Sequence, residues 1–216
     1  MNTFSIIIAL TPIAVYCIVL GSLYLRRHPK VVSGGRDLAC LGLAMIGLFI
    51  IGPAELFFPQ AAFNVFGLSV WFMLLVLYVF MLMFAILNSK PRLIVFGLEV
   101  ESLTCQVDRA LQQLDPGTKW LSHSFVAPGL GIHGIVERAG VGVVCQISAT
   151  KREQDLLGWL ALERTLAQNL RTVDIERSVT GQRWIALGIA LLGLIGYTLI
   201  RRPDAIAQGI QDMLRN

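Results

Sequence analysis

Residues 67–87 read GLSVWFMLLVLYVFMLMFAIL, a run of 21 residues without a charge or a proline. A helix of that length is roughly 30 Å long at about 1.5 Å rise per residue, which matches the hydrocarbon core of a bilayer. The run is apolar on every face, whereas an amphipathic helix on a soluble core has a single apolar stripe. It therefore predicts a membrane-spanning helix.

Three other apolar runs accompany it, at about residues 4–25, 38–58 and 184–200. The first two are long enough to span a bilayer. The last has 17 residues, three of them glycines, so it either spans thinly or packs as a short helix against the others. The composition, with 55% hydrophobic and 15% charged residues, also favours a membrane protein, and we expect four transmembrane helices.

A polar segment, residues 89–181, lies between the third and fourth apolar runs. Its hydrophobic pattern predicts strands and helices in the order β-α-β-β-β-α. The expected strands cover residues 92–98, 119–126, 132–138 and 141–149, and the expected helices cover residues 100–114 and about 153–172. Thr150 and Glu153 form a capping box that would open the second of these helices.

The expected fold class is thus an α-helical integral membrane protein with a small soluble α+β domain inserted between its third and fourth helices. Residues 1–88 would hold three transmembrane helices and residues 89–181 the α+β domain. Residues 182–216 would hold the fourth helix and an amphipathic tail on the membrane surface. Between the first two runs, Ser33, Gly34 and Gly35 predict a turn, and Asp37 is expected to cap the next helix.

The basic residues beside the apolar runs predict the orientation. With the N-terminus outside, the cytoplasmic side collects eight of them: Arg26, Arg27, Lys30, Arg36, Lys90, Arg92, Arg177 and Arg183. The outside keeps Arg201, Arg202 and Arg215, of which the first two run against the bias. The positive-inside rule therefore predicts a multi-pass protein of the plasma (inner) membrane whose soluble domain faces the cytoplasm.

Glu55 is the single ionisable residue that the expected spans place at membrane depth. An intramembrane carboxylate suggests a transport or proton-relay function. Glu55 also lies within a turn of Pro59 and Gln60, so the alternative is a structural position at the membrane interface.

One cluster could bind a metal. A turn near Pro128 would bring His123 close to His133 across a hairpin, and Glu137 lies four residues further on the same strand face. Two imidazoles and a carboxylate are a common zinc ligand set. The alternative is that the two histidines are ordinary surface or core residues, because a shift of one residue in register moves a side chain to the other face.

Cys145 with His133 could also form a nucleophile and base pair. Cys145, however, lies on the apolar face of its expected strand, where a thiol is inert. No nucleotide-binding loop is present, and neither a cofactor nor an enzymatic activity is expected. Residues 89–183 carry 11 basic and 10 acidic side chains, so nucleic acid is not an expected partner.

Three functions follow from these observations. The expected one is a non-enzymatic anchor, scaffold or sensor, with the lipid bilayer as its solvent and a cytoplasmic domain that binds a protein partner or a small ligand. Its glycine-rich helices would also allow a homo-oligomer. The alternatives are a transporter or channel component that uses Glu55, and a membrane-bound metal-dependent enzyme that uses His123, His133 and Glu137.

Overall fold

The structure is a computed structural model that describes residues 3–54, 65–67, 69–140, 143–151, 153–175 and 178–201. The chain divides into two compact units. Unit 1 comprises Met1–Leu20, Leu38–Leu87 and Arg183–Asn216, and unit 2 comprises Gly21–Asp37 and Asn88–Gln182.

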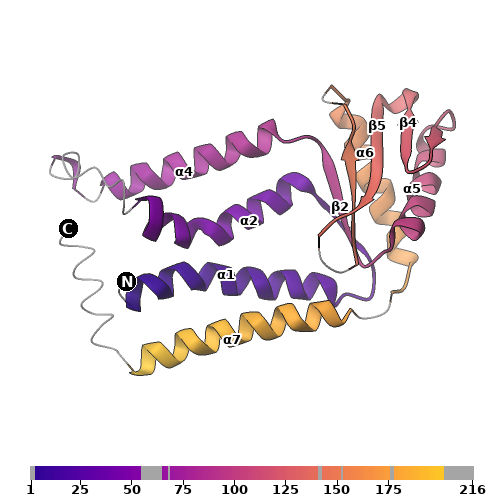
Figure 1. Cartoon of the computed structure of the whole chain (residues 1–216). Coiled ribbons are helices and arrows are strands. Elements are labelled where there is room, and N and C mark those ends of the chain that lie inside the picture. Colours follow the sequence, from indigo (N-terminus) through magenta and orange to yellow (C-terminus); the bar gives the residue numbers. More distant parts are fainter. Residues whose placement is uncertain are drawn as a thin grey trace. The chain divides into compact units, whose positions relative to one another are not determined.

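The apolar runs form four long helices (Figure 1). They are α1 (Thr3–Tyr24), α2 (Gly34–Phe49), α4 (Ser69–Asn88) and α7 (Val179–Arg201). All four are long and apolar enough to cross a membrane. The last has 23 residues, because the helix begins before the apolar run that starts at Trp184, and it is therefore longer than the sequence pattern suggests.

Glycines allow close contacts between the helices of unit 1. The Tyr78 hydroxyl of α4 donates a hydrogen bond of 2.6 Å to the Gly42 carbonyl of α2. Gly47 of α2 lies against the Ile8 carbonyl of α1, and Gly188 of α7 lies against α1 at Ala14. In unit 1 the helices thus neighbour one another in the order α4, α2, α1, α7 (Figure 1).

Proline shapes two of these helices. Pro12 lies inside α1 and has no N–H, so it leaves the Ile8 carbonyl without its usual intrahelical donor. This is the carbonyl that Gly47 approaches, and a Cβ atom at position 47 would collide with it. At the end of α2, a π-helical turn, η1 (Ile50–Ala54), contains Pro53.

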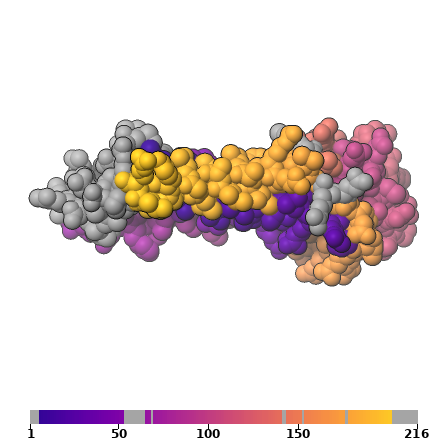
Figure 2. Space-filling view, turned by 90° about the horizontal axis from the view of Figure 1, so that it is seen from below, coloured from indigo at the N-terminus to yellow at the C-terminus, as the bar shows by residue number. Residues whose placement is uncertain are grey.

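Apolar side chains cover the outer surfaces of the unit 1 helices. Phe72, Phe80 and Met81 of α4 are 68%, 69% and 62% exposed. Figure 2 views α7 from the side that faces away from α1. On α7, the side chains of Leu187, Ile189 and Leu194 are also exposed. Contiguous apolar surface of this extent is rare on soluble monomers.

Unit 2 contains a six-stranded antiparallel sheet in the order β1-β2-β6-β5-β4-β3. The strands are β1 (Lys30–Ser33), β2 (Arg92–Phe96), β3 (Lys119–Leu121), β4 (Ser124–Ala127), β5 (Ile132–Arg138) and β6 (Val144–Ala149). Two helices, α5 (Val100–Leu114) and α6 (Leu156–Asn169), cover one face (Figure 1). The short 3-10 turns η2 (Pro128–Leu130) and η3 (Leu170–Thr172) join these elements.

The core of unit 2 lies between the sheet and the two helices. Every second strand residue contributes to it, because side chains alternate between the two faces of a sheet. The residues with less than 2% exposure include Val95, Phe125, Ile132, Val136 and Ile147 of the strands and Leu103, Leu111, Leu162 and Leu166 of the helices.

The segment between α1 and α2 differs from the expectation of a turn at Ser33 to Gly35. Residues 30–33 instead form β1, which pairs with β2 along its whole length. The strand is stabilised by Val31, which packs on the unit 2 core. Helix α2 then begins at Gly34 without any linker, and Asp37 lies in its first turn instead of capping it. The expected domain boundary of residues 89–181 therefore leaves out a strand of the sheet.

Two local predictions in the polar segment are also wrong. The strand expected at residues 119–126 is a hairpin of β3 and β4, because Ser122 takes a left-handed conformation with φ 56° and reverses the chain. The N-cap of α6 is Asp155, whose side chain accepts from the Leu157 N–H at 2.9 Å. Thr150 and Glu153 do not cap it, because Gln154 binds the backbone of His133 and holds this segment beside β5.

Candidate functional site

Glu55, the intramembrane candidate, lies outside the described residues, as does the amphipathic tail expected after residue 203. The transport hypothesis for Glu55 therefore stays a prediction.

The structure distributes the histidine candidates over two positions of the sheet. His123 lies in the turn between β3 and β4, and its carbonyl accepts from the Val136 N–H at 2.9 Å. His133 pairs instead with Val126, so the two histidines do not face each other across the hairpin. Glu137 lies on the same face of β5 as His133, four residues away.

Glu137 belongs to a small polar network on the outer face of the sheet. Its carboxylate accepts from Gln146 Nε2 at 2.7 Å and from Ser148 Oγ at 2.9 Å. Within the described part of the chain, no group of three or more His, Cys, Asp or Glu side chains could hold a metal ion. The arrangement is that of cross-strand pairing on a partly exposed sheet surface.

Cys145 is a core residue. It is 1% exposed, and its thiol donates to the Leu98 carbonyl at 3.1 Å. Burial raises the pKa of the Cys145 thiol above its usual value of 9.0, while Arg138 opposes the shift and Glu99 adds to it. His133 lies on the other face of the sheet, so the two residues do not form a nucleophile and base pair.

A cleft of about 320 Å³ lies beside Cys145 in unit 2. Its lining includes Glu99 and Glu101 at the start of α5, and Arg138 of β5. The Glu99 side chain makes no capping hydrogen bond to the helix. The cleft thus combines charges of both signs with an apolar floor.

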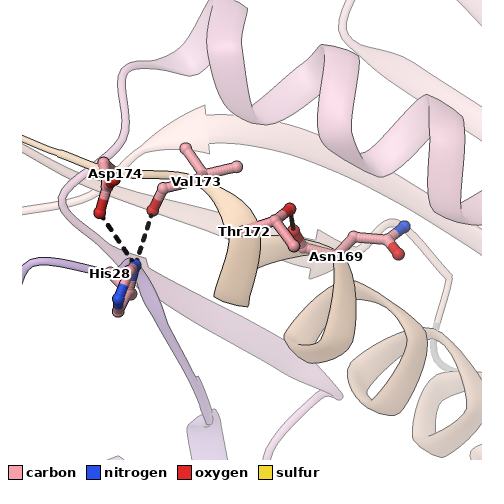
Figure 3. Close-up of polar contacts among 5 residues, drawn as sticks. All are labelled: His28, Asn169, Thr172, Val173 and Asp174. Atoms are coloured by element: carbon pink, nitrogen blue, oxygen red, sulfur yellow. Dashed lines mark hydrogen bonds and ion pairs between the residues drawn. The ribbon is translucent and has the colours of Figure 1, made fainter.

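One set of polar contacts in unit 2 joins two segments that are distant in sequence (Figure 3). His28 Nδ1 lies 3.2 Å from the Val173 carbonyl and 3.4 Å from Asp174 Oδ1. The Ile175 N–H donates to the Arg27 carbonyl at 2.8 Å. These bonds, which we call the clasp, fix the segment after α6 to the segment after α1.

Apolar contacts reinforce the clasp. Val173 and Ile175 both pack against the unit 2 core. The Ile175 side chain lies directly on Gly97, whose φ of +93° favours glycine and where a Cβ atom would collide with it. Before the clasp, the Thr172 hydroxyl donates to the Asn169 carbonyl at 2.9 Å and closes the end of α6 (Figure 3).

The last turn of α1 and the first turn of α2 also pack within unit 2. The Tyr24 ring meets the Phe96 ring edge to face, with 5.3 Å between centroids. Arg92 lies over Gly34, and its guanidinium is 3.9 Å from Asp37 Oδ2. Sequence reasoning missed all of these contacts. The two β-branched residues Val31 and Val32 are the signal that could have indicated a strand.

A scan of protein-family models and searches of the curated proteins and of the solved structures found no match, so the geometry of the chain itself has to carry the interpretation.

Proposed function

We propose that this chain is a four-helix protein of the plasma membrane, with its N-terminus outside and its sheet domain in the cytoplasm. In this proposal the domain binds a protein partner or a small ligand without catalysis and passes the binding event to the helices. The exposed apolar surfaces of α4 and α7 support membrane insertion. The distribution of basic residues supports the orientation.

The continuity between helices and sheet carries the proposal. Strand β1 lies between α1 and α2, separated from α1 by five residues and from α2 by none. Helix α4 ends at Asn88, and β2 begins at Arg92. The last turn of α1 and the first turn of α2 belong to the same compact unit as the sheet. In this proposal, a change in the sheet reaches the helices through these short connections.

Thiol labelling tests the orientation. Cys105 is exposed on α5, so a membrane-impermeant maleimide should label it only after intact cells are permeabilised. As a control, Val65→Cys in a Cys105→Ser background introduces a thiol at a 74% exposed position between α2 and α4. This control should react in intact cells. Labelling of Cys105 in intact cells, or release of the protein from membranes by alkaline carbonate, would contradict the proposal.

Hydrogen exchange of the full chain in nanodiscs tests the coupling. Ile147→Ala creates a cavity in the central strand β6 and should destabilise the sheet by about 2–5 kcal/mol. We expect faster exchange in the sheet and also in residues 21–24 and 34–37. Ile135→Ala, on the partly exposed face of β5, is the matched control and should have a small effect. Faster exchange confined to the sheet and its two covering helices would refute the coupling.

A further inference from the structure

The loop of residues 26–30, directly after α1, carries three exposed cations. They are Arg26, Arg27 and Lys30. In the part of the chain that the structure describes, none of the three has an acidic partner. Of the described acidic residues at this end of unit 2, Asp37 faces Arg92 and Asp174 faces His28.

The backbone of this loop is held by hydrogen bonds, although none of its three cationic side chains has an acidic partner among the described residues. The Leu25 N–H donates to the Gly21 carbonyl, which ends α1, and the clasp holds Arg27 and His28. Pro29 is buried, and Lys30 already pairs with Phe96 as the first residue of β1. Ligand binding to such a surface therefore costs little conformational entropy of the backbone.

The loop directly follows an apolar helix in sequence. Arg26 is two residues beyond the end of α1, which is long and apolar enough to cross a membrane. If α1 spans the bilayer, as proposed above, the loop lies at the level of the lipid head groups. The inference rests on that proposed function.

We infer that residues 26–30 form a preorganised binding surface for the phosphate of anionic phospholipid head groups. The planar guanidinium of arginine matches a phosphate with two parallel hydrogen bonds, and Arg26 and Arg27 are adjacent. Lys30 adds a third charge on the rigid start of β1. Each cation near an anionic surface contributes roughly fivefold in affinity, so the three together contribute on the order of 100-fold.

Thermal unfolding of the full chain in a neutral detergent tests this inference. Short-chain phosphatidylglycerol, phosphatidylcholine and inorganic phosphate are added separately to the wild type and to the triple variant Arg26→Gln, Arg27→Gln, Lys30→Gln. Phosphatidylglycerol should stabilise the wild type, and its apparent affinity should fall on the order of 100-fold in the triple variant. Phosphatidylcholine and inorganic phosphate should have little effect on either protein.

The control variant removes the same number of charges from exposed positions on unit 2: Arg109→Gln, Lys119→Gln, Arg164→Gln. In sequence these positions lie far from the ends of α1, α2, α4 and α7. It should respond to phosphatidylglycerol like the wild type. Equal responses of the triple variant and the wild type would overturn the inference, as would stabilisation by inorganic phosphate alone. If alkaline carbonate does not extract the wild type from membranes, such a result refutes only the lipid site. If carbonate does extract it, the membrane proposal fails first.

Discussion

At the scale of single residues, burial decides what a side chain can do. Cys145 and Cys105 are both free thiols in unit 2, but only Cys105 is exposed. Cys145 packs between strand and helix residues, and its thiol donates a hydrogen bond to the Leu98 carbonyl. The thiolate is the reactive form of cysteine, and the raised pKa of Cys145 makes this form rarer at neutral pH. Cysteine can act in catalysis, but Cys145 is a core residue in this protein.

The two thiols should differ strongly in reactivity. In the native protein at pH 8, iodoacetamide should modify Cys105 well before Cys145, and in denaturant the two rates should converge because burial is lost. Peptide mass spectrometry of the alkylated protein measures both sites in one sample. Equal rates in the native protein would show that Cys145 is accessible and ionised, contrary to its position in the structure.

At the scale of elements, tertiary contacts determine where helix α6 begins. Thr150 and Glu153 have the spacing of a capping box, but the Gln154 side chain binds both the N–H and the carbonyl of His133. These bonds hold Gln154 beside β5. The helix then starts after Asp155, which provides the N-cap. Tertiary contacts thus place the N-cap of α6 at Asp155 instead of at the predicted Thr150.

Asp155→Ala should therefore destabilise the protein, by about 1 kcal/mol, because the Leu157 N–H loses its acceptor. Thr150→Ala is the matched control. It keeps the backbone bond from the Thr150 N–H to the His133 carbonyl and should have little effect. Chemical unfolding of the two variants in detergent measures the difference. A larger loss for the threonine variant would restore the capping box of the original prediction.

At the scale of the whole molecule, close helix contacts depend on a few glycines. Helix α1 has an Ile8 carbonyl that Pro12 deprives of its donor, and α2 presents Gly47 to it. In lipid, helices associate through such close packing and not through the hydrophobic effect. Gly193 of α7 is different, since no atom of the described residues lies within 4 Å of the position a Cβ would take.

Gly47→Leu should consequently disrupt the packing of α1 and α2, because a side chain there collides with the backbone of α1. We expect a loss of several kcal/mol, comparable with severe overpacking of a core. Gly193→Leu should be tolerated. Size-exclusion chromatography of the heated, detergent-solubilised variants measures the surviving folded fraction. Similar survival of both variants would argue against the α1 and α2 contact.

The sequence alone determined the elements whose signal is long or local. Four apolar runs predicted four helices, the last of which is longer than its 17-residue run, and alternation of apolar residues predicted β5 and β6. Hydrophobic periodicity gives this signal because it reflects the surroundings of each residue. The α5 helix is also confirmed, at the predicted residues 100–114.

Tertiary structure alone decided the rest. Strand β1 has four residues, which are too few for a periodic signal. It forms because it pairs with the edge of β2. The clasp joins His28 to Val173 and Asp174, residues about 145 positions apart, and no local pattern encodes such a contact. The register of β4 and β5 likewise separated His123 from His133, because the side chains that a strand brings together depend on its partner and not on its own sequence.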